Sequence, residues 1–328
     1  MKILGIETSC DETAAAVVED GRKIISNVVS SSEAIHAKVG GVIPETAARE
    51  QLKYILPVIE EATKDTDFDA IAVTEGPGLI GSLLIGVETA KALAYGKNLP
   101  LIPVNHLVGH IYANWLNEEE PVLPAIALVA SGAHSDIVLM KDHGKFEYLG
   151  GTRDDAAGEA FDKAARLLGL PYPGGPAIDR EAKLGTAGKI KLPRPLRDED
   201  TYDFSFSGLK TALRQIVAPN SQLPISNSKF PISDLAAEVQ EAITDVLVQK
   251  TIRAANRNQV NSILLGGGVA ANRRLREKLR EKWSGQLSIP EVKFSTDNAA
   301  MIAAAAFFNN HPVDPLKLLA DSSLSLQT

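Results

Sequence analysis

The sequence predicts an α/β protein built from two halves with a similar order of elements. Each half opens with three strand-like runs and continues with alternating helices and strands. A polar stretch with two prolines, NEEEPVLP at 117–124, separates the halves. We therefore expect one lobe at 1–118 and a second at 122–297, with residues 298–328 packing back on the first lobe. Two unrelated α/β domains are the alternative to a repeat.

The first lobe shows the clearest periodicity. Its strand-like runs are separated by turn residues and lie at 2–6, 14–19 and 23–30. Helices and buried strands then alternate, at 45–63, 69–74, 79–95 and 101–104. In the first helix, Leu52 and Leu56 are predicted on the apolar face with Ile55 and Ile59, and Pro57 is expected to kink or divide it. Asn105 can cap the helix that follows the last strand.

The second lobe repeats this order with a longer insertion. Its strand-like runs lie at 123–131, 135–141 and 145–150. Helices are predicted at 156–168, 178–184, 234–257 and 270–283, with strands at 262–265 and 292–294. A further helix, at 298–309, is predicted in the segment that packs back on the first lobe. Ser233 is expected to cap the helix at 234–257. The stretch 185–231 has no regular pattern and holds many of the prolines.

Composition limits the classes of function. The chain has 328 residues, a hydrophobic fraction of 45% and a net charge of −7, which is typical of a globular protein and argues against non-specific nucleic-acid binding. Cys10 is the single cysteine, so neither an intramolecular disulfide nor a cysteine-based zinc site can form. The first residues do not form a signal peptide, and no apolar run reaches membrane-spanning length. We therefore expect a cytoplasmic protein.

Two glycine-rich segments could approach a ligand. GPGLIG at 76–81 fits a dinucleotide fingerprint, but the next strand ends in Asn105 without the required carboxylate, so a packed turn is the preferred interpretation. GGGVAANRRL at 266–275 follows a buried strand and opens a helix whose N-terminus favours anions. Asn272 lies in its first turn and could face a purine or ribose, although a packed turn explains this segment equally well.

The segment GIETSCDET at 5–13 crowds polar side chains into the turn between two strands. Hydroxyl and backbone N–H groups in such a turn suit phosphate, whereas its carboxylates suit a cation or a base. An ordinary solvated hairpin is the alternative.

A pair of histidines gives the metal signal. His106 and His110 are four residues apart on a predicted helix, so both imidazoles can reach one ion. A zinc protease of the HExxH type needs Glu after the first His, and Leu107 stands there. A third ligand is required. Asp297 is one candidate, although Asp is also a common helix cap, and spacing does not rank it against the others, which are His134, His36 and Asp136.

Seven segments between Met1 and about Phe307, taken together, point to one protein family. They are GIETSCDET, GPGLIGSLLIG, NHLVGH, DDAAGEAFDKAARLLGLPYPGGP, DFSFSGLKTAL, GGGVAANRRLR and STDNAAMIAAA. In this order they resemble the bacterial TsaD family of tRNA threonylcarbamoyltransferases, once labelled glycoproteases.

The resemblance implies an actin-like, ribonuclease-H-like (ASKHA) fold with duplicated βββαβα lobes. It implies transfer of a threonylcarbamoyl group from threonylcarbamoyl-AMP to N6 of A37, the adenosine beside the anticodon, in tRNAs reading ANN codons, which forms t6A. It implies as partners tRNA, a TsaB-type pseudo-homologue bound through the N-terminal lobe, and a TsaE-type ATPase. An actin-like ATPase or regulatory module is the main alternative, and a metal-dependent hydrolase is another.

The resemblance also assigns site residues. It implies one metal ion, Fe²⁺ or alternatively Zn²⁺, on His106, His110 and Asp297. An adenine nucleotide, as part of the acyl donor or as ATP or ADP, would bind a set of residues in the second lobe: Val129, Ala130, Ser131, Gly132, Ala133, Asp162, Gly175, Asp179 and Asn272. Ala133 stands where the family usually has a glycine, and such a glycine could serve a positive φ or close phosphate approach. Asp11 and Glu12 are our candidates for the proton acceptor.

Basic residues are unevenly distributed despite the net negative charge. Six of them load one predicted helix, at positions 273, 274, 276, 278, 280 and 282. Glu277 and Glu281 lie in the same helix, so a solvated, internally paired face is the alternative. We expect weak, salt-sensitive tRNA binding by the chain alone, on a local basic surface that partners complete.

Overall fold

The computed structural model describes residues 1–217 and 229–327, and these form two compact units. Unit 1 comprises residues 1–121, 142–146 and 290–328, and unit 2 comprises 122–141 and 147–289. The division into lobes at 1–118 and 122–297 stays a prediction, but residues 290–297, assigned from the sequence to the second lobe, belong to unit 1. The predicted irregular stretch 185–231 includes residues 218–228, which lie outside the described residues.

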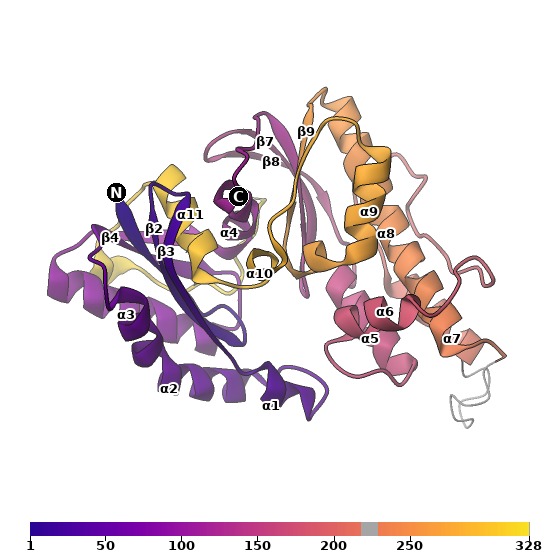
Figure 1. Cartoon of the computed structure of the whole chain (residues 1–328), viewed down its shortest axis with the longest axis horizontal. Coiled ribbons are helices and arrows are strands. Elements are labelled where there is room, and N and C mark those ends of the chain that lie inside the picture. Colours follow the sequence, from indigo (N-terminus) through magenta and orange to yellow (C-terminus); the bar gives the residue numbers. More distant parts are fainter. Residues whose placement is uncertain (218–228, 328) are drawn as a thin grey trace. The chain divides into compact units, whose positions relative to one another are not determined.

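Unit 1 contains a mixed five-stranded sheet in the order β3-β2-β1-β4-β5. Its strands β2, β3 and β4 are labelled in Figure 1. Its strands are β1 (Lys2–Glu7), β2 (Glu12–Glu19), β3 (Lys23–Ser31), β4 (Ala70–Gly76) and β5 (Leu101–Asn105). The first three form an antiparallel meander, whereas β4 runs parallel to both β1 and β5. The carboxyl ends of β1, β4 and β5 therefore meet at one edge.

Helices cover both faces of this sheet. They are α1 (Glu33–Ala37), α2 (Pro44–Thr63), α3 (Ile80–Lys97), α4 (His106–Tyr112), α10 (Val292–Ser295) and α11 (Ala299–Phe308), with short 3₁₀ turns at Ala113–Leu116 and Pro315–Lys317. Leu4 and Ile6 of β1 pack with the buried residues of α2 and α3. Gly5, between them, faces the backbone of α11 on the opposite side.

Unit 2 contains a second five-stranded sheet, in the order β10-β9-β6-β7-β8. Its strands are β6 (Ala125–Ala130), β7 (Ser135–Asp142), β8 (Lys145–Gly151), β9 (Ser262–Gly266) and β10 (Gln286–Ser288). Counted from the third strand of its meander, this sheet reads β8-β7-β6-β9-β10, which matches β3-β2-β1-β4-β5 of unit 1. Strand β9 runs parallel to both β6 and β10, as β4 does to β1 and β5. This matching order confirms the predicted repeat.

The helices of unit 2 surround one large core. They are α5 (Ala157–Leu167), α6 (Gly174–Ala182), α7 (Ser207–Val217), α8 (Ile232–Arg257) and α9 (Arg273–Lys282), with a 3₁₀ turn at Gly268–Ala271. The buried core joins residues of β6, β7 and β9 to residues of α5, α7 and α8. No helix among the described residues is both long and apolar enough to cross a membrane.

Several element predictions are wrong in detail. Residues 292–294 form helix α10 rather than a strand, and the edge strand is β10. Helix α8 begins at Ile232 after Pro231, so Ser233 lies inside its first turn and does not cap it. Helix α2 continues through Pro57 without a break. Leu52 and Leu56, predicted on its buried face, are exposed.

Candidate active site

The carboxyl edge of the unit 1 sheet places a histidine helix beside a buried carboxylate. Strand β1 ends at Glu7, and β5 ends at Asn105 directly before α4. The Asn105 side chain accepts a hydrogen bond from the backbone N–H of Leu107 at 2.9 Å, so it caps α4 as predicted. The helix therefore starts with His106 at the sheet edge, and His110 follows one turn later.

Helix α11 brings Asp297 to the same place. Asn298, not Asp297, caps α11 by accepting from the Met301 N–H at 3.1 Å, which leaves the Asp297 carboxylate free of that role. Close approach of the helix depends on two glycines. A Cβ at Gly5 would lie 2.3 Å from the Ala299 carbonyl oxygen, and one at Gly109 would lie 2.7 Å from an Ile302 methyl carbon.

His106, His110 and Asp297 form a compact group of potential ligands. Their ligand atoms all lie within 4.8 Å of one another. Asp297 Oδ1 is 3.5 Å from His106 Nε2 and 3.2 Å from His110 Nε2, and the two rings meet edge-on. Both ring nitrogens of His110 are buried and make no hydrogen bond to any described residue. Two imidazoles, one carboxylate and an orphaned buried nitrogen fit a divalent ion such as iron or zinc, so this group could hold a metal.

Burial and opposite charges together set the electrostatics of this group. Burial disfavours protonated His106, but the Glu7 and Asp297 carboxylates outweigh that effect and raise the pKa of His106 to about 9. For Asp297, burial opposes the charged form, yet His106 and His110 lower the pKa of its carboxyl to about 2. Burial lowers the pKa of His110. The carboxylate is therefore ionised and suited to a cation.

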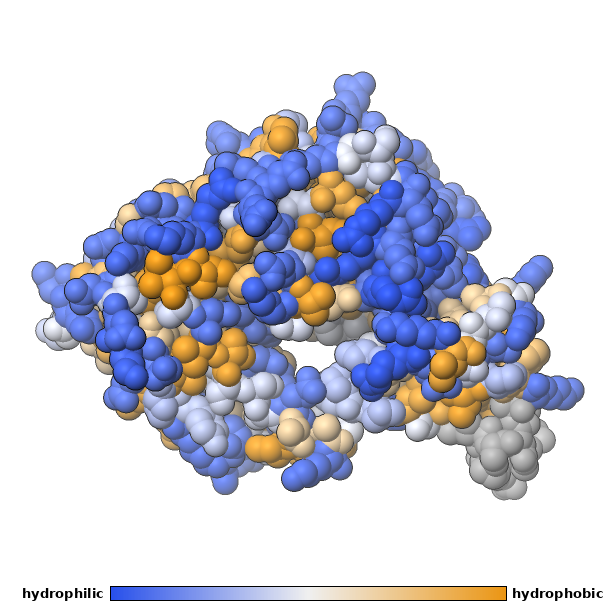
Figure 2. Space-filling model, in the orientation of Figure 1, coloured by the Kyte–Doolittle hydropathy of each residue, from blue (hydrophilic) through white to orange (hydrophobic). Residues whose placement is uncertain are grey.

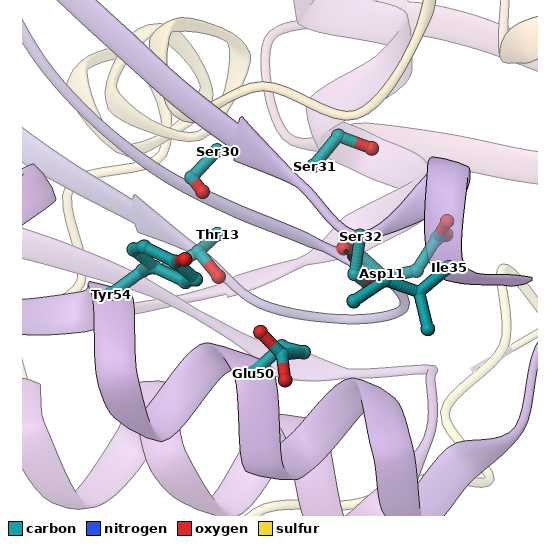
Figure 3. A pocket seen from close by; sticks show the side chains of 8 residues that line it. All are labelled: Asp11, Thr13, Ser30, Ser31, Ser32, Ile35, Glu50 and Tyr54. Atoms are coloured by element: carbon teal, nitrogen blue, oxygen red, sulfur yellow. Dashed lines mark hydrogen bonds between the residues drawn. The ribbon is translucent and has the colours of Figure 1, made fainter.

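Asp11 in the β1–β2 turn and Glu12, the first residue of β2, are the sequence candidates for a proton acceptor. Burial, together with the Asp297 and Asp11 charges, raises the pKa of Glu12. Asp11 lines a polar pocket of about 180 Å³ whose walls come from the turn, the end of β3, α1 and α2 (Figure 3). The lining is rich in hydroxyl and carboxylate groups and comprises Asp11, Thr13, Ser30, Ser31, Ser32, Ile35, Glu50 and Tyr54. Asp11 is therefore accessible from this pocket.

The other proposed third ligands do not join the histidine pair. Among the described residues, His106, His110 and Asp297 are the only histidine, cysteine and acidic group close enough to hold an ion. His36 instead accepts a hydrogen bond from the Ile43 N–H at 3.2 Å through Nδ1. Asp136 accepts a hydrogen bond from the Tyr148 hydroxyl at 3.3 Å. The structure thus selects Asp297 from the alternatives that spacing left open.

The nucleotide residues that the resemblance assigned all lie in unit 2. Val129 and Ala130 end β6, and residues 131–133 form the turn into β7. Close backbone contacts link this turn to its neighbours: Gly158 at the start of α5 donates to the Ser131 carbonyl at 3.0 Å, and a Cβ at Gly267 would lie 2.3 Å from the Ala130 carbonyl. The backbone at Ala133 has no positive φ, so alanine is unstrained there.

The remaining residues of that set lie on three helices. Asp162 of α5 accepts from the Gly174 N–H at 2.7 Å and so satisfies the first N–H of α6, next to Gly175. Asp179 of α6 accepts from Gln240 at 2.7 Å and lies 3.9 Å from the first residue of α9, Arg273. Asn272 caps α9, as its Oδ1 accepts from the Leu275 N–H at 3.0 Å. Each polar side chain thus already has a structural partner.

Comparison with known proteins gives the family. A family model described as "TsaD: tRNA N6-adenosine threonylcarbamoyltransferase" matches residues 23–304. The tRNA N6-adenosine threonylcarbamoyltransferase of Bacillus subtilis is 54% identical over 314 residues, which cover 93% of this chain and 89% of the relative. The protein of the same name from Thermomicrobium roseum is 51% identical and covers 94% of this chain and 92% of the relative. This chain belongs to the TsaD family.

Solved structures outside the TsaD family share its fold. Component A of (R)-2-hydroxyglutaryl-CoA dehydratase from Acidaminococcus fermentans matches with a TM-score of 0.54 at 15% identity, covering 94% of this chain and 98% of that one. HypF from T. kodakarensis matches with a TM-score of 0.58 at 12% identity, covering 94% of this chain and 48% of that one. The actin-like α/β fold predicted from the TsaD resemblance is confirmed.

One residue of this TsaD-family site was not singled out by sequence reasoning. In the sequence, Glu7 is only one of the polar groups of GIETSCDET, yet its Oε2 lies 3.0 Å from His106 Nδ1. The two residues are 99 positions apart. The parallel pairing of β1, β4 and β5 is the signal that could have found it, because residues that end neighbouring parallel strands share one edge.

Proposed function

We propose that this chain transfers the threonylcarbamoyl group from threonylcarbamoyl-AMP to N6 of A37 in tRNAs reading ANN codons, forming t6A. The observation that carries the proposal is family membership over nearly the whole chain, at 51–54% identity to relatives named for this activity. The buried His-His-Asp group supports it, because an actin-like ATPase needs a carboxylate-held Mg²⁺ rather than imidazole ligands. The transferase is therefore favoured over the regulatory ATPase. The setting we propose is the cytoplasm.

The reaction exchanges one bond to the carbamoyl carbon for another and moves one proton. The N6 nitrogen attacks the carbamoyl carbonyl carbon, the bond from that carbon to the phosphate oxygen breaks, AMP leaves, and the N6 proton passes to a base. We propose Asp11 or Glu12 as that base, since Asp11 lines the polar pocket and the pKa of Glu12 is raised by burial and by neighbouring carboxylates. AMP is a good leaving group, so the chain's main task is to orient the two substrates.

His106, His110 and Asp297 would hold the metal, for which we propose Fe²⁺, with Zn²⁺ as the alternative. A bound ion of this kind supplies a Lewis acid that polarises an acyl or phosphate oxygen. The adenine nucleotide, either as part of the donor or as ATP or ADP, would lie along the β6–β7 turn and the starts of α6 and α9. Backbone N–H groups at helix N-termini suit its phosphate there.

We propose a TsaB-type partner on the exposed side of α2 and a TsaE-type ATPase as a further component. Helix α2 leaves two large apolar side chains exposed one turn apart, Leu52 and Leu56. Apolar surface, drawn in orange, appears over the part of unit 1 that holds α1 and α2 (Figure 2). Exposed apolar clusters rimmed by polar residues are typical of protein interfaces. Leu52→Glu combined with Leu56→Glu should abolish heterodimer formation in gel filtration, with unchanged metal content.

One assay tests the proposed reaction. Purified metal-loaded chain, with its partner proteins, unmodified tRNA and threonylcarbamoyl-AMP, should yield t6A detected by mass analysis of the digested nucleosides. His110→Ala should lose both the metal and t6A formation, because one of three ligands is removed. Absence of t6A with the metal-replete chain and all partners would overturn the proposal. Retained metal in His110→Ala would overturn the ligand assignment.

A further inference from the structure

We propose that Glu7 is a positioning residue that fixes the tautomer and ring orientation of His106, so that Nε2 is the nitrogen offered to the metal. Glu7 is the last residue of β1, and it is 0% exposed. No other described residue places a carboxylate on the Nδ1 side of the His106 ring. The inference rests on the metal centre proposed above and adds to it a residue that makes no contact with the ion.

The hydrogen-bond inventory around Glu7 decides which atoms carry protons. The Ser9 backbone N–H donates to Oε1 at 2.5 Å, and the Thr74 hydroxyl donates to Oε2 at 2.5 Å. His106 Nδ1 lies 3.0 Å from the same Oε2. An ionised carboxylate only accepts, so Nδ1 of the ring must carry a proton. A backbone N–H, a hydroxyl and an imidazole N–H together satisfy both oxygens of a buried carboxylate.

This arrangement fixes the opposite end of the ring. With Nδ1 held as the donor to Glu7, Nε2 is the nitrogen that can offer a lone pair to a metal ion, and Nε2 lies 3.5 Å from Asp297 Oδ1. The imidazole nitrogen and the carboxylate oxygen are thus placed as two ligands of one ion. A carboxylate on the far nitrogen of a metal-binding imidazole also raises its basicity, which strengthens ligation.

Replacing Glu7 by Gln would reverse the tautomer with almost no change in volume. A glutamine amide offers one acceptor and one donor end, whereas the Ser9 N–H can only donate. The oxygen of the amide must therefore face Ser9, which turns its NH₂ group toward His106 Nδ1. Nδ1 then accepts, the imidazole proton moves to Nε2, and the lone pair that would bind the ion is lost. The alternative orientation places an amide N–H against the Ser9 N–H at 2.5 Å.

A purely structural carboxylate would behave differently. If Glu7 served only to satisfy Ser9 and Thr74 in the turn, the Gln variant would lose stability but would bind the metal with the same affinity and the same ring tautomer. Metal affinity and the protonation state of the His106 ring therefore separate positioning from structure. Neither readout depends on catalytic activity.

The test compares four proteins by zinc titration against a competing chelator and by nitrogen NMR of ¹⁵N-histidine-labelled chain. These are the unsubstituted chain, Glu7→Gln, Glu75→Gln as a matched loss of a neighbouring carboxylate on β4, and His106→Ala to assign the signal. We expect the unsubstituted chain and Glu75→Gln to bind one zinc ion with a proton on Nδ1 of His106. We expect Glu7→Gln to bind zinc about 10–100-fold more weakly, with the metal-free ring protonated on Nε2.

Three results would overturn this inference, and they differ in what else they overturn. Unchanged zinc affinity in Glu7→Gln, with the proton still on Nδ1, overturns the positioning role while leaving the metal centre intact. Failure of the unsubstituted chain to bind zinc or ferrous iron overturns the metal centre and with it this inference. Equal weakening in Glu75→Gln shows a general charge effect and also overturns the positioning role. Thermal unfolding of each variant establishes that the chain is folded in every comparison.

Discussion

A single buried amide, that of Gln51 on α2, shapes the turn that carries Asp11 and Glu12. Its Nε2 donates to the backbone carbonyls of Cys10 at 3.1 Å and Glu12 at 2.9 Å. Because the carbonyls lie in the turn itself, the amide holds the backbone on either side of Asp11. The orientation of the proposed base thus depends on a residue 39 positions away in the sequence.

Gln51→Met should keep the volume of the side chain but remove these bonds. Leaving buried carbonyls unpaired costs about 1–3 kcal/mol, so urea unfolding should show a loss of that order. We expect t6A formation to fall at least tenfold while zinc stoichiometry stays at one, because the metal group is not touched. Gln249→Met is the control, since that amide donates to the exposed Asp198. Full activity in Gln51→Met would show that the turn does not need this support.

Asp136 on β7 should make unit 2 less stable as the pH rises. Burial raises the pKa of Asp136 to about 6 from 3.8, although the Tyr148 hydroxyl opposes the shift. The folded state therefore binds the proton more tightly than the unfolded state. This contribution to stability is present at pH 4 and is lost as the pH rises through 6.

Asp136→Asn should consequently gain stability relative to the unsubstituted chain between pH 4 and pH 6, by roughly 1–2 kcal/mol once its partial exposure is allowed for. Urea unfolding at half-unit pH steps measures the difference. Asp142→Asn, at the exposed end of the same strand, should show no gain in this window, because hydrogen bonds lower the pKa of Asp142. A difference that is flat with pH for Asp136→Asn would contradict the shift.

Residue spacing predicted part of the site and could not predict the rest. The i, i+4 spacing of His106 and His110 was enough to propose a shared ion. The third ligand was not fixed by spacing, because Asp297 precedes a helix and could have been its cap. Only the structure shows that Asn298 takes that role. Glu7 required knowledge of which strands pair, which a local pattern does not contain.

At the scale of elements, the position of Asp297 depends on how closely α11 approaches β1. Gly5 permits this approach, since a Cβ there would lie 2.3 Å from the Ala299 carbonyl oxygen and 2.9 Å from the Ala303 nitrogen. Both contacts are with the helix backbone, so no side-chain rotation can relieve them. Helix α11 would have to move away from the sheet.

Gly5→Ala should therefore lower stability by about 1–3 kcal/mol through overpacking and should also weaken zinc binding, because the displaced helix carries Asp297 with it. Gly96→Ala in α3 is the matched control: nothing lies within 4 Å of its Cβ position, and alanine favours a helix by roughly 0.5–1 kcal/mol. Chelator competition and urea unfolding measure both effects. Normal zinc affinity in a destabilised Gly5→Ala would separate helix packing from the metal group.

The elements that the sequence predicted well are those with strong, local periodicity. Helix α2 was predicted to within one residue, but Pro57 does not divide it, because Pro57 is exposed and its missing hydrogen bond leaves a carbonyl that water can reach. Helix α7 was missed inside an irregular stretch, although its buried Leu209, Leu213 and Val217 recur at helical spacing. Val292 and Phe294 have side chains that favour strands, but a run of three residues is too short for this preference to determine the structure.

At the scale of the whole molecule, the chain repeats one sheet order twice and carries its basic residues unevenly. The structure shows that much of the basic helix α9 is already paired. Arg274 contacts Glu241 at 2.6 Å, and Lys278, which is 2% exposed, contacts Glu241 and Asp245 at 2.6 Å each. These charges stabilise the α8–α9 layer rather than facing solvent. Fewer positive charges of α9 are therefore available to bind tRNA than its sequence suggests.

Binding of tRNA by the isolated chain should accordingly be weak and steeply dependent on salt. With a net charge of −7, attraction must come from a few local cations, and each phosphate contact contributes about −0.7 to −0.9 to the slope of log K against log salt. We expect Arg280→Ala, which removes an exposed charge of α9, to weaken binding and reduce that slope by about one contact. Lys64→Ala, at the end of α2, should leave it unchanged. Fluorescence anisotropy with labelled tRNA between 50 and 200 mM salt measures the affinity and the salt slope of each variant. Tight, salt-insensitive binding by the chain alone would contradict a local basic surface that needs partners to complete it.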